Sequence, residues 1–91
     1  MIYFLIPAYE EEGTLGLLLY KIRQVMREIR RDYLVVVLDD GSADGTAQVV
    51  EQYKRFLPVK LLRHAENRGF GPSLDRLVRE AARLSRYPER D

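Results

Sequence analysis

The sequence VVVLDDGSADGT, at residues 35–46, indicates how this chain folds. Its first four residues are all apolar, which is typical of a strand that helices cover on both faces of a parallel sheet. Acidic and small residues then end the apolar run, and a helical pattern follows them. Ligands of open α/β sheets bind beyond the carboxyl ends of the strands, so we expect Asp39 and Asp40 to lie at a binding site.

Asp39 and Asp40 each have two interpretations. In the structural one, a carboxylate accepts hydrogen bonds from backbone N–H groups of the glycine turn that follows. In the functional one, the other carboxylate faces the crevice and accepts a hydrogen bond from a base N–H or a ribose hydroxyl. Asp44 comes just before the helical pattern, where its side chain can accept hydrogen bonds from the first N–H groups of the helix.

The rest of the chain continues this alternation of strands and helices. Apolar, β-rich runs predict strands at residues 2–6, 33–38 and 59–63. Apolar residues at helical spacing predict a helix after each strand, and the side chains expected to face inward are Leu15, Leu18, Leu19, Ile22, Val25, Met26, Ile29, Ala47, Val50, Tyr53, Leu57, Leu74, Leu77, Val78, Ala81 and Leu84. Residues 87–91 are predicted to terminate the last helix. This order predicts an α/β fold, a three-layer and Rossmann-like arrangement whose parallel strands lie in the order 3-2-1.

The strand at residues 2–6 would form one edge of this sheet, although its apolar residues are typical of a central strand. An uncovered apolar edge promotes association with other chains. We therefore expect that a fourth strand, following Asp91 in a longer protein, lies beside this edge. The alternative is a homo-oligomer that forms through the same edge.

Composition restricts the classes of protein to which the chain can belong. With 91 residues it forms at most one domain, residues 1–91, which is short for an α/β domain. The net charge of +1 gives no reason to expect a nucleic-acid partner. The absence of cysteine excludes thiolate catalysis and is compatible with the cytoplasm. No apolar stretch approaches the roughly 20 residues of a membrane span, and residues 1–6 are too short for a signal peptide.

Two further loops carry residues suited to binding. Tyr9, beside Pro7 at the end of the first strand, is placed to flank a flat ligand. The glutamates at residues 10–12 precede a helix whose positive dipole end favours them, which accounts well for Glu12. Loop 64–72 carries glycines that free its backbone, and the lone His64 is interpreted as a surface residue without a catalytic role.

Several phosphate and nucleotide chemistries do not fit this sequence. The chain has no P-loop, and Gly69-Phe70-Gly71 lacks the third glycine of a dinucleotide fingerprint. Ser42 stands where haloacid-dehalogenase-type phosphatases place a nucleophilic aspartate. Receiver domains need a separate phosphorylatable aspartate and a lysine on later strands, and Lys60 is not an obvious match.

Three motifs together resemble a known family. They are IPAYEEEGTL at residues 6–15, VVLDDGSADGT at residues 36–46 and NRGFG at residues 67–71. In this order, each after a predicted strand, they resemble the amino-terminal half of family-2 glycosyltransferases, and most nearly the polyprenyl-phosphate sugar synthases similar to dolichyl-phosphate mannose synthase. The resemblance implies the GT-A fold and inverting transfer of a sugar from a nucleotide diphosphate sugar. It also implies a polyprenyl phosphate acceptor and a cytoplasmic location, peripheral to the membrane.

The resemblance also assigns roles to particular residues. Loop residues would bind the nucleotide: Pro7, Ala8 and Tyr9 line the base pocket, Glu11 reaches the nucleoside, and Asp40 with Asp39 hydrogen-bonds the base or ribose. Gly69 and Gly71 would let the third loop close over the nucleotide. Glu10 departs from the asparagine that is usual in the family at this position.

One feature of the family is absent from the sequence. The Asp-x-Asp signature, which holds a divalent metal (Mg or Mn) against the diphosphate, does not occur in this chain, and the catalytic base would also lie downstream. Because the metal stabilises the leaving diphosphate, we expect this segment to bind a nucleotide sugar but to be inactive alone. The alternative is a stand-alone nucleotide-binding or regulatory module without catalysis.

Overall fold

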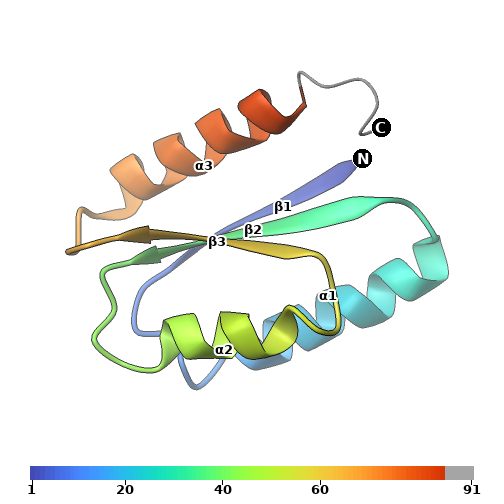
Figure 1. Cartoon of the computed structure of the whole chain (residues 1–91), viewed down its shortest axis with the longest axis horizontal. Coiled ribbons are helices and arrows are strands. Elements are labelled where there is room, and N and C mark those ends of the chain that lie inside the picture. The colour runs from blue at the N-terminus through green and yellow to red at the C-terminus, as the bar shows by residue number, and fades with distance from the viewer. Residues whose placement is uncertain (86–91) are drawn as a thin grey trace.

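The computed structural model describes residues 1–85, and the predicted terminator at residues 87–91 lies outside this part. Strands and helices alternate as the sequence predicts (Figure 1). Their bounds are β1 Ile2–Ala8, α1 Leu15–Ile29, β2 Tyr33–Asp40, α2 Thr46–Tyr53, β3 Val59–His64 and α3 Phe70–Leu84.

The three strands form one parallel sheet with β2 in the centre. Val35 of β2 lies between Phe4 of β1 and Val59 of β3, which fixes the register of all three strands. Helix α3 covers one face of the sheet, and α1 and α2 cover the other (Figure 1). The predicted three-layer α/β fold and the strand order 3-2-1 are therefore confirmed.

Strand β2 supplies the core of both faces. Val35 and Val37 pack in the cluster that contains the buried residues of α1 and α2, whereas Val36 and Leu38 pack against Leu77 of α3. All four side chains are fully buried. A strand between two helical layers needs apolar residues on both sides, which is why this run does not alternate.

All three strands extend further than the sequence pattern indicates. β1 continues through Pro7 to Ala8, because Pro7 lies on an edge strand where its missing N–H removes no bond from the centre of the sheet. β2 continues through Asp39 and Asp40, which pair with Arg63 and His64 of β3. The two acids are therefore the last residues of the central strand, rather than the first residues of a loop.

The prediction that three apolar side chains of α1 lie in the core is wrong. Leu18, Val25 and Ile29 are about half exposed. They lie on one flank of the helix, because positions spaced by four and seven residues share a side. The opposite flank of α1 faces α2, where Gly16 lies against Tyr53. The exposed stripe therefore projects past β1, the strand that pairs with β2 alone within residues 1–85.

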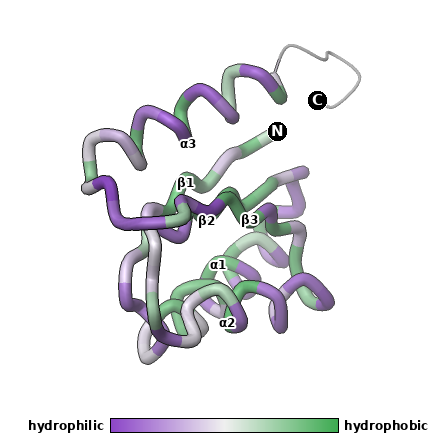
Figure 2. Tube along the Cα trace, turned by 60° about the vertical axis from the view of Figure 1, so that its left-hand side comes forward, coloured by the Kyte–Doolittle hydropathy of each residue, from purple (hydrophilic) through white to green (hydrophobic). Residues whose placement is uncertain are grey.

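Helix α3 shows the same pattern on the other face of the sheet. Hydrophobic and hydrophilic segments alternate along it (Figure 2). Helix α3 packs over β1 and β2, and Glu80 accepts a hydrogen bond from Lys60, so this flank of α3 faces β3. Leu74 and Val78, which were predicted to be in the core, lie on the opposite flank and are 38% and 51% exposed. Apolar side chains from both helical layers thus flank the open edge of β1.

Glu80 ties α3 to the sheet. Its carboxylate accepts hydrogen bonds from Arg83 at 2.9 and 2.8 Å and from Lys60 of β3. The hydrogen bonds from Arg83 and then Lys60 lower the pKa of Glu80 from 4.5 to about 2, against the opposing effect of burial. The ionised carboxylate is therefore stabilised in the folded chain.

We expect Glu80→Gln to lower the free energy of unfolding at pH 7 by about 1–2 kcal/mol. Because the folded pKa is depressed, the contribution of Glu80 is fully present above about pH 4.5 and is lost as the pH falls toward about 2. Urea denaturation of both proteins across this range should show the difference shrinking in acid. Glu51→Gln, which removes an exposed pair with Lys54, is the matched control and should have little effect. An equal difference at every pH would contradict the expectation.

Candidate functional site

The loops after β1 and β2 are joined by reciprocal hydrogen bonds at the carboxyl edge of the sheet. Three consecutive backbone N–H groups of the first loop donate to side chains of the second: Glu10 to Ser42 Oγ at 2.9 Å, Glu11 to Thr46 Oγ1 at 2.9 Å and Glu12 to Asp44 Oδ2 at 3.3 Å. In return, carboxylates of the first loop accept from the second: Glu10 from Ala43 and Asp44 at 2.7 and 3.3 Å, and Glu12 from Gly45 at 3.1 Å. The two loops therefore hold each other in place.

These bonds correct the role predicted for the glutamates. Glu10 and Glu12 serve the N–H groups that precede α2, rather than the dipole of the helix that follows them. Asp44 accepts a hydrogen bond from the N–H of Thr46 at 3.0 Å, as its position before the helix predicts. Carboxylates of the chain thus accept hydrogen bonds from the N–H groups of residues 43–46, which lead into α2.

Glu10 also adopts an unusual backbone conformation. Its φ of 55° lies in the left-handed region, which is costly for most residues and least so for glycine and asparagine. The asparagine usual in the family that this sequence resembles would suit that conformation. Glu10 instead adds a carboxylate that reaches two N–H groups of the neighbouring loop, which gives the departure a structural role.

Asp40 is the centre of the third loop contact. Its Oδ1 accepts from His64 Nδ1 at 2.8 Å and from the N–H of Arg68 at 2.9 Å, and its Oδ2 accepts from the N–H of Gly69 at 2.8 Å. Burial raises the pKa of Asp40, but these hydrogen bonds together hold it below its ordinary value. The carboxylate is ionised, and Oδ2 keeps an acceptor position for a further donor.

The interpretation of His64 as a surface residue is therefore wrong. Its side chain is 9% exposed and is oriented by Asp40. A single histidine in a sequence gives no sign of such a partner, because Asp40 is 24 residues away and only the pairing of β2 with β3 brings them together.

Asp39 lies on the opposite face of the sheet from Asp40, since successive side chains of a strand alternate. It is fully buried, and its Oδ1 accepts from the N–H of Ser42 in the glycine turn at 3.0 Å, which is the structural interpretation given above. Its Oδ2 forms an ion pair with Arg63 at 3.4 Å and has no hydrogen bond within the described residues. The structure separates the two acids, and only Asp40 faces the pocket.

A pocket of about 300 Å³ lies between the ends of β1 and β2 and the start of α3. Its lining comprises Pro7, Ala8, Tyr9, Glu11, Asp40, Asn67, Gly69, Phe70 and Ser73. The predicted site residues are thus brought together, apart from Asp39 and Gly71, which do not line it. The volume is at the lower end of the range for small-molecule sites.

Asn67, Phe70 and Ser73 also line this pocket. Asn67 and Phe70 stand in the NRGFG motif, but the sequence assigned no role to them or to Ser73. Their proximity to the glycines of the third loop was the available signal. The start of α3 is well fixed, because Ser73 Oγ donates to the carbonyl of Gly69 at 2.8 Å.

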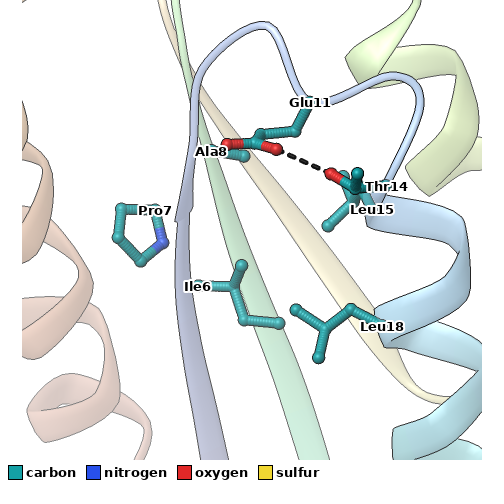
Figure 3. A pocket seen from close by; sticks show the side chains of 7 residues that line it. All are labelled: Ile6, Pro7, Ala8, Glu11, Thr14, Leu15 and Leu18. Atoms are coloured by element: carbon teal, nitrogen blue, oxygen red, sulfur yellow. Dashed lines mark hydrogen bonds between the residues drawn. The ribbon is translucent and has the colours of Figure 1, made fainter.

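A second hollow, of about 240 Å³, lies on the other side of β1 (Figure 3). Apolar residues of β1 and α1 line it, including Ile6, Pro7 and Leu18. Glu11 lines both hollows, and its carboxylate accepts a hydrogen bond from Thr14 at 2.7 Å. This hollow is part of the open β1 edge.

The described residues show no sign of a metal site or a membrane span. Within residues 1–85, no group of three or more His, Cys, Asp or Glu side chains is arranged to hold a metal ion. None of the helices in this part of the chain combines the length and apolar character that a membrane crossing requires. A hollow of about 500 Å³ lies against Gln24 and Arg27 of α1, toward the amino ends of the strands and far from the loops described above.

The absence of a side chain at Gly41 lets the second loop pack closely against the third. Gly41 has a φ of 76°, and a Cβ at this position would lie 2.5 Å from backbone atoms of Glu66 and Asn67. We expect Gly41→Ala to lower the free energy of unfolding by about 2 kcal/mol or more, because it adds both backbone strain and a backbone clash. Thermal denaturation measures this, and Gly13→Ala, which meets nothing within 4 Å, should be nearly neutral. Similar stability of the two variants would refute the expectation.

Comparisons with known proteins agree with this architecture. The curated undecaprenyl-phosphate 4-deoxy-4-formamido-L-arabinose transferase of Pseudomonas fluorescens is 35% identical over 66 residues, which is 72% of this chain and 19% of that protein. The dolichyl-phosphate beta-glucosyltransferase of Dictyostelium discoideum is 30% identical over 80 residues, 79% of this chain and 24% of that protein. The chain thus spans about a fifth to a quarter of the length of these relatives.

A solved structure is similar as well. S. aureus TarS 1–349 superimposes with a TM-score of 0.72 at 28% sequence identity, over 87% of this chain and 24% of that one. The two proteins therefore share the α/β fold described above over about a quarter of the larger chain. Because the model of Glycosyl transferase family 2 matches residues 3–83, nearly the whole chain, this protein belongs to that family.

Proposed function

We propose that this chain is the nucleotide-binding part of an inverting glycosyltransferase and holds the nucleoside of a nucleotide diphosphate sugar. The observation that carries the proposal is the convergence of Pro7, Tyr9, Glu11, Asp40 and Gly69, from three separate loops, on one pocket. Family membership supplies the reaction class, and the pocket supplies the place for the donor.

The chemistry of the pocket suits a nucleoside. Tyr9 is half exposed and presents a ring beside Pro7, which favours stacking with a flat base. The ionised Asp40 has an acceptor position left on Oδ2, and a carboxylate acceptor favours a base with a ring N–H, such as uracil or guanine. Glu11 on the rim is placed to accept from a ribose hydroxyl.

We propose that the acceptor and a metal ion are bound by residues outside the described part of the chain. Relatives named for transfer to undecaprenyl phosphate and dolichyl phosphate support a polyprenyl phosphate acceptor, and hence action at the cytoplasmic surface of a membrane. The acids of residues 1–85 form no metal site, and Asp39 and Asp40 are engaged by the chain itself. A divalent Mg or Mn ion would be held by residues outside this part and would neutralise the charge that develops on the leaving diphosphate.

Calorimetry with UDP and GDP should detect binding, and Tyr9→Ala should weaken it about tenfold because a base stack is lost. Tyr20 is a tyrosine of similar exposure on α1, so the Tyr20→Ala variant should bind as the unmodified chain does.

A transfer assay with Mn²⁺ and several sugar nucleotides should show no turnover by the purified chain. No binding of either nucleotide would refute the proposal, and robust turnover would refute the inactivity of this segment. Binding without turnover, if the natural chain ends here, would favour the stand-alone module.

We further propose that the open edge of β1 is an association surface. It is flanked by Leu18, Val25 and Ile29 of α1 and by Leu74 and Val78 of α3, so a strand added there would find apolar cover on both faces. In a longer protein, a fourth strand would pair with β1 along this edge. In the isolated chain, a second copy of the chain would pair there instead.

Light scattering should therefore show that the purified chain self-associates as its concentration rises. Leu18→Asp should shift it toward the monomer, because it places a charge beside the edge. Leu17→Asp is the matched control, since Leu17 is the adjacent leucine, is 60% exposed and faces away from the edge. A strictly monomeric chain at high concentration, or equal effects of the two variants, would count against this surface.

A further inference from the structure

Phe70 is the most exposed large hydrophobic side chain among those of residues 1–85, at 68%. It is the first residue of α3 and lines the pocket between this helix and the ends of β1 and β2. We propose that Phe70 is a ligand-contacting residue that stacks on the base of the bound nucleotide, as the second aromatic wall of the slot that Tyr9 begins. This inference rests on the proposed function.

No aromatic ring of residues 1–85 packs against the exposed side chain of Phe70. Phe56, the other strongly exposed phenylalanine, packs edge-on against Tyr53 with ring centroids 6.1 Å apart. The guanidinium carbon of Arg23 lies over its ring, 5.9 Å from the centroid. The ring pairs within residues 1–85 join Tyr53 with Phe56 and Phe4 with Tyr33, and Phe70 belongs to neither. An exposed aromatic ring that lines a pocket is suited to stacking with a flat ligand.

The backbone beneath Phe70 is fixed before any ligand arrives. The N–H of Gly69 donates to Asp40, and the carbonyl of Gly69 accepts from the hydroxyl and the N–H of Ser73. Asp40 itself lies on the wall of the same pocket. Asp40 thus offers an acceptor to the base and also fixes the turn that carries Phe70. The hydrogen bond to the base and the stack on Phe70 are therefore pre-organised relative to each other.

Tyr9 and Phe70 reach the pocket from different elements. Tyr9 follows β1, and Phe70 begins α3, and both line the same hollow. Stacking tolerates any base, because every base presents a π-face. We therefore assign affinity to the two rings and base selectivity to Asp40.

The chain contains no tryptophan, so Phe70→Trp introduces a single fluorophore at the pocket. Titration with UDP or GDP should quench this fluorescence, because a stacked base lies on the indole. Phe56→Trp is the matched control, since residue 56 is 56% exposed and lies outside the pocket. Its fluorescence should stay unchanged over the same titration.

Calorimetry gives the second measurement. Phe70→Leu keeps an apolar side chain but removes the ring, and we expect its Kd for the nucleotide to rise about tenfold. Phe70→Tyr keeps the ring and should restore the original affinity. If the unmodified chain binds nucleotide while Phe70→Leu binds equally well and Trp at position 70 is not quenched, the role of Phe70 is refuted and the proposed function stands. If the unmodified chain binds no nucleotide, both are refuted.

Discussion

The carboxylate of Asp40 is the interaction on which this edge of the molecule depends. It ends the central strand, is buried, and accepts hydrogen bonds from His64 and from the N–H groups of Arg68 and Gly69. A buried carboxylate must be paired, and here the partners belong to β3 and to the loop before α3. One side chain therefore fixes the third loop and still faces the pocket.

The first two loops are fixed by a different device, in which each loop satisfies the N–H groups of the other. Carboxylates of Glu10 and Glu12 occupy the N–H groups before α2, and side chains of the second loop accept from the first. The pocket lies between the ends of β1 and β2 and the start of α3, and Tyr9 and Glu11 of the first loop line it.

The fold could be predicted in detail because its signals are local, whereas side-chain environments could not. The continuous apolar run Val35–Leu38 indicates a strand that is covered on both faces, whichever elements provide the cover. Val25 and Leu74 are apolar at helical spacing, yet they are exposed because the spacing identifies a helix face and not what covers it. His64 was assigned to the surface since its partner lies on another strand. Phe70 stands in a recognised motif, but its role could not be predicted because nothing in a sequence marks a ring as exposed in a pocket.

Sequence alone was sufficient for the alternation of strands and helices, the order of the parallel sheet, the family and most residues of the pocket. Each of these follows from periodicity or from short motifs whose residues are neighbours in the chain. The tertiary structure decided that Asp39 and Asp40 face opposite sides, that Glu10 and Glu12 bond to the loop before α2, and that apolar stripes from two helices flank one open strand. Those properties depend on which atoms meet across the fold, and strand pairing and loop packing set these contacts over separations of about 20 to 35 residues.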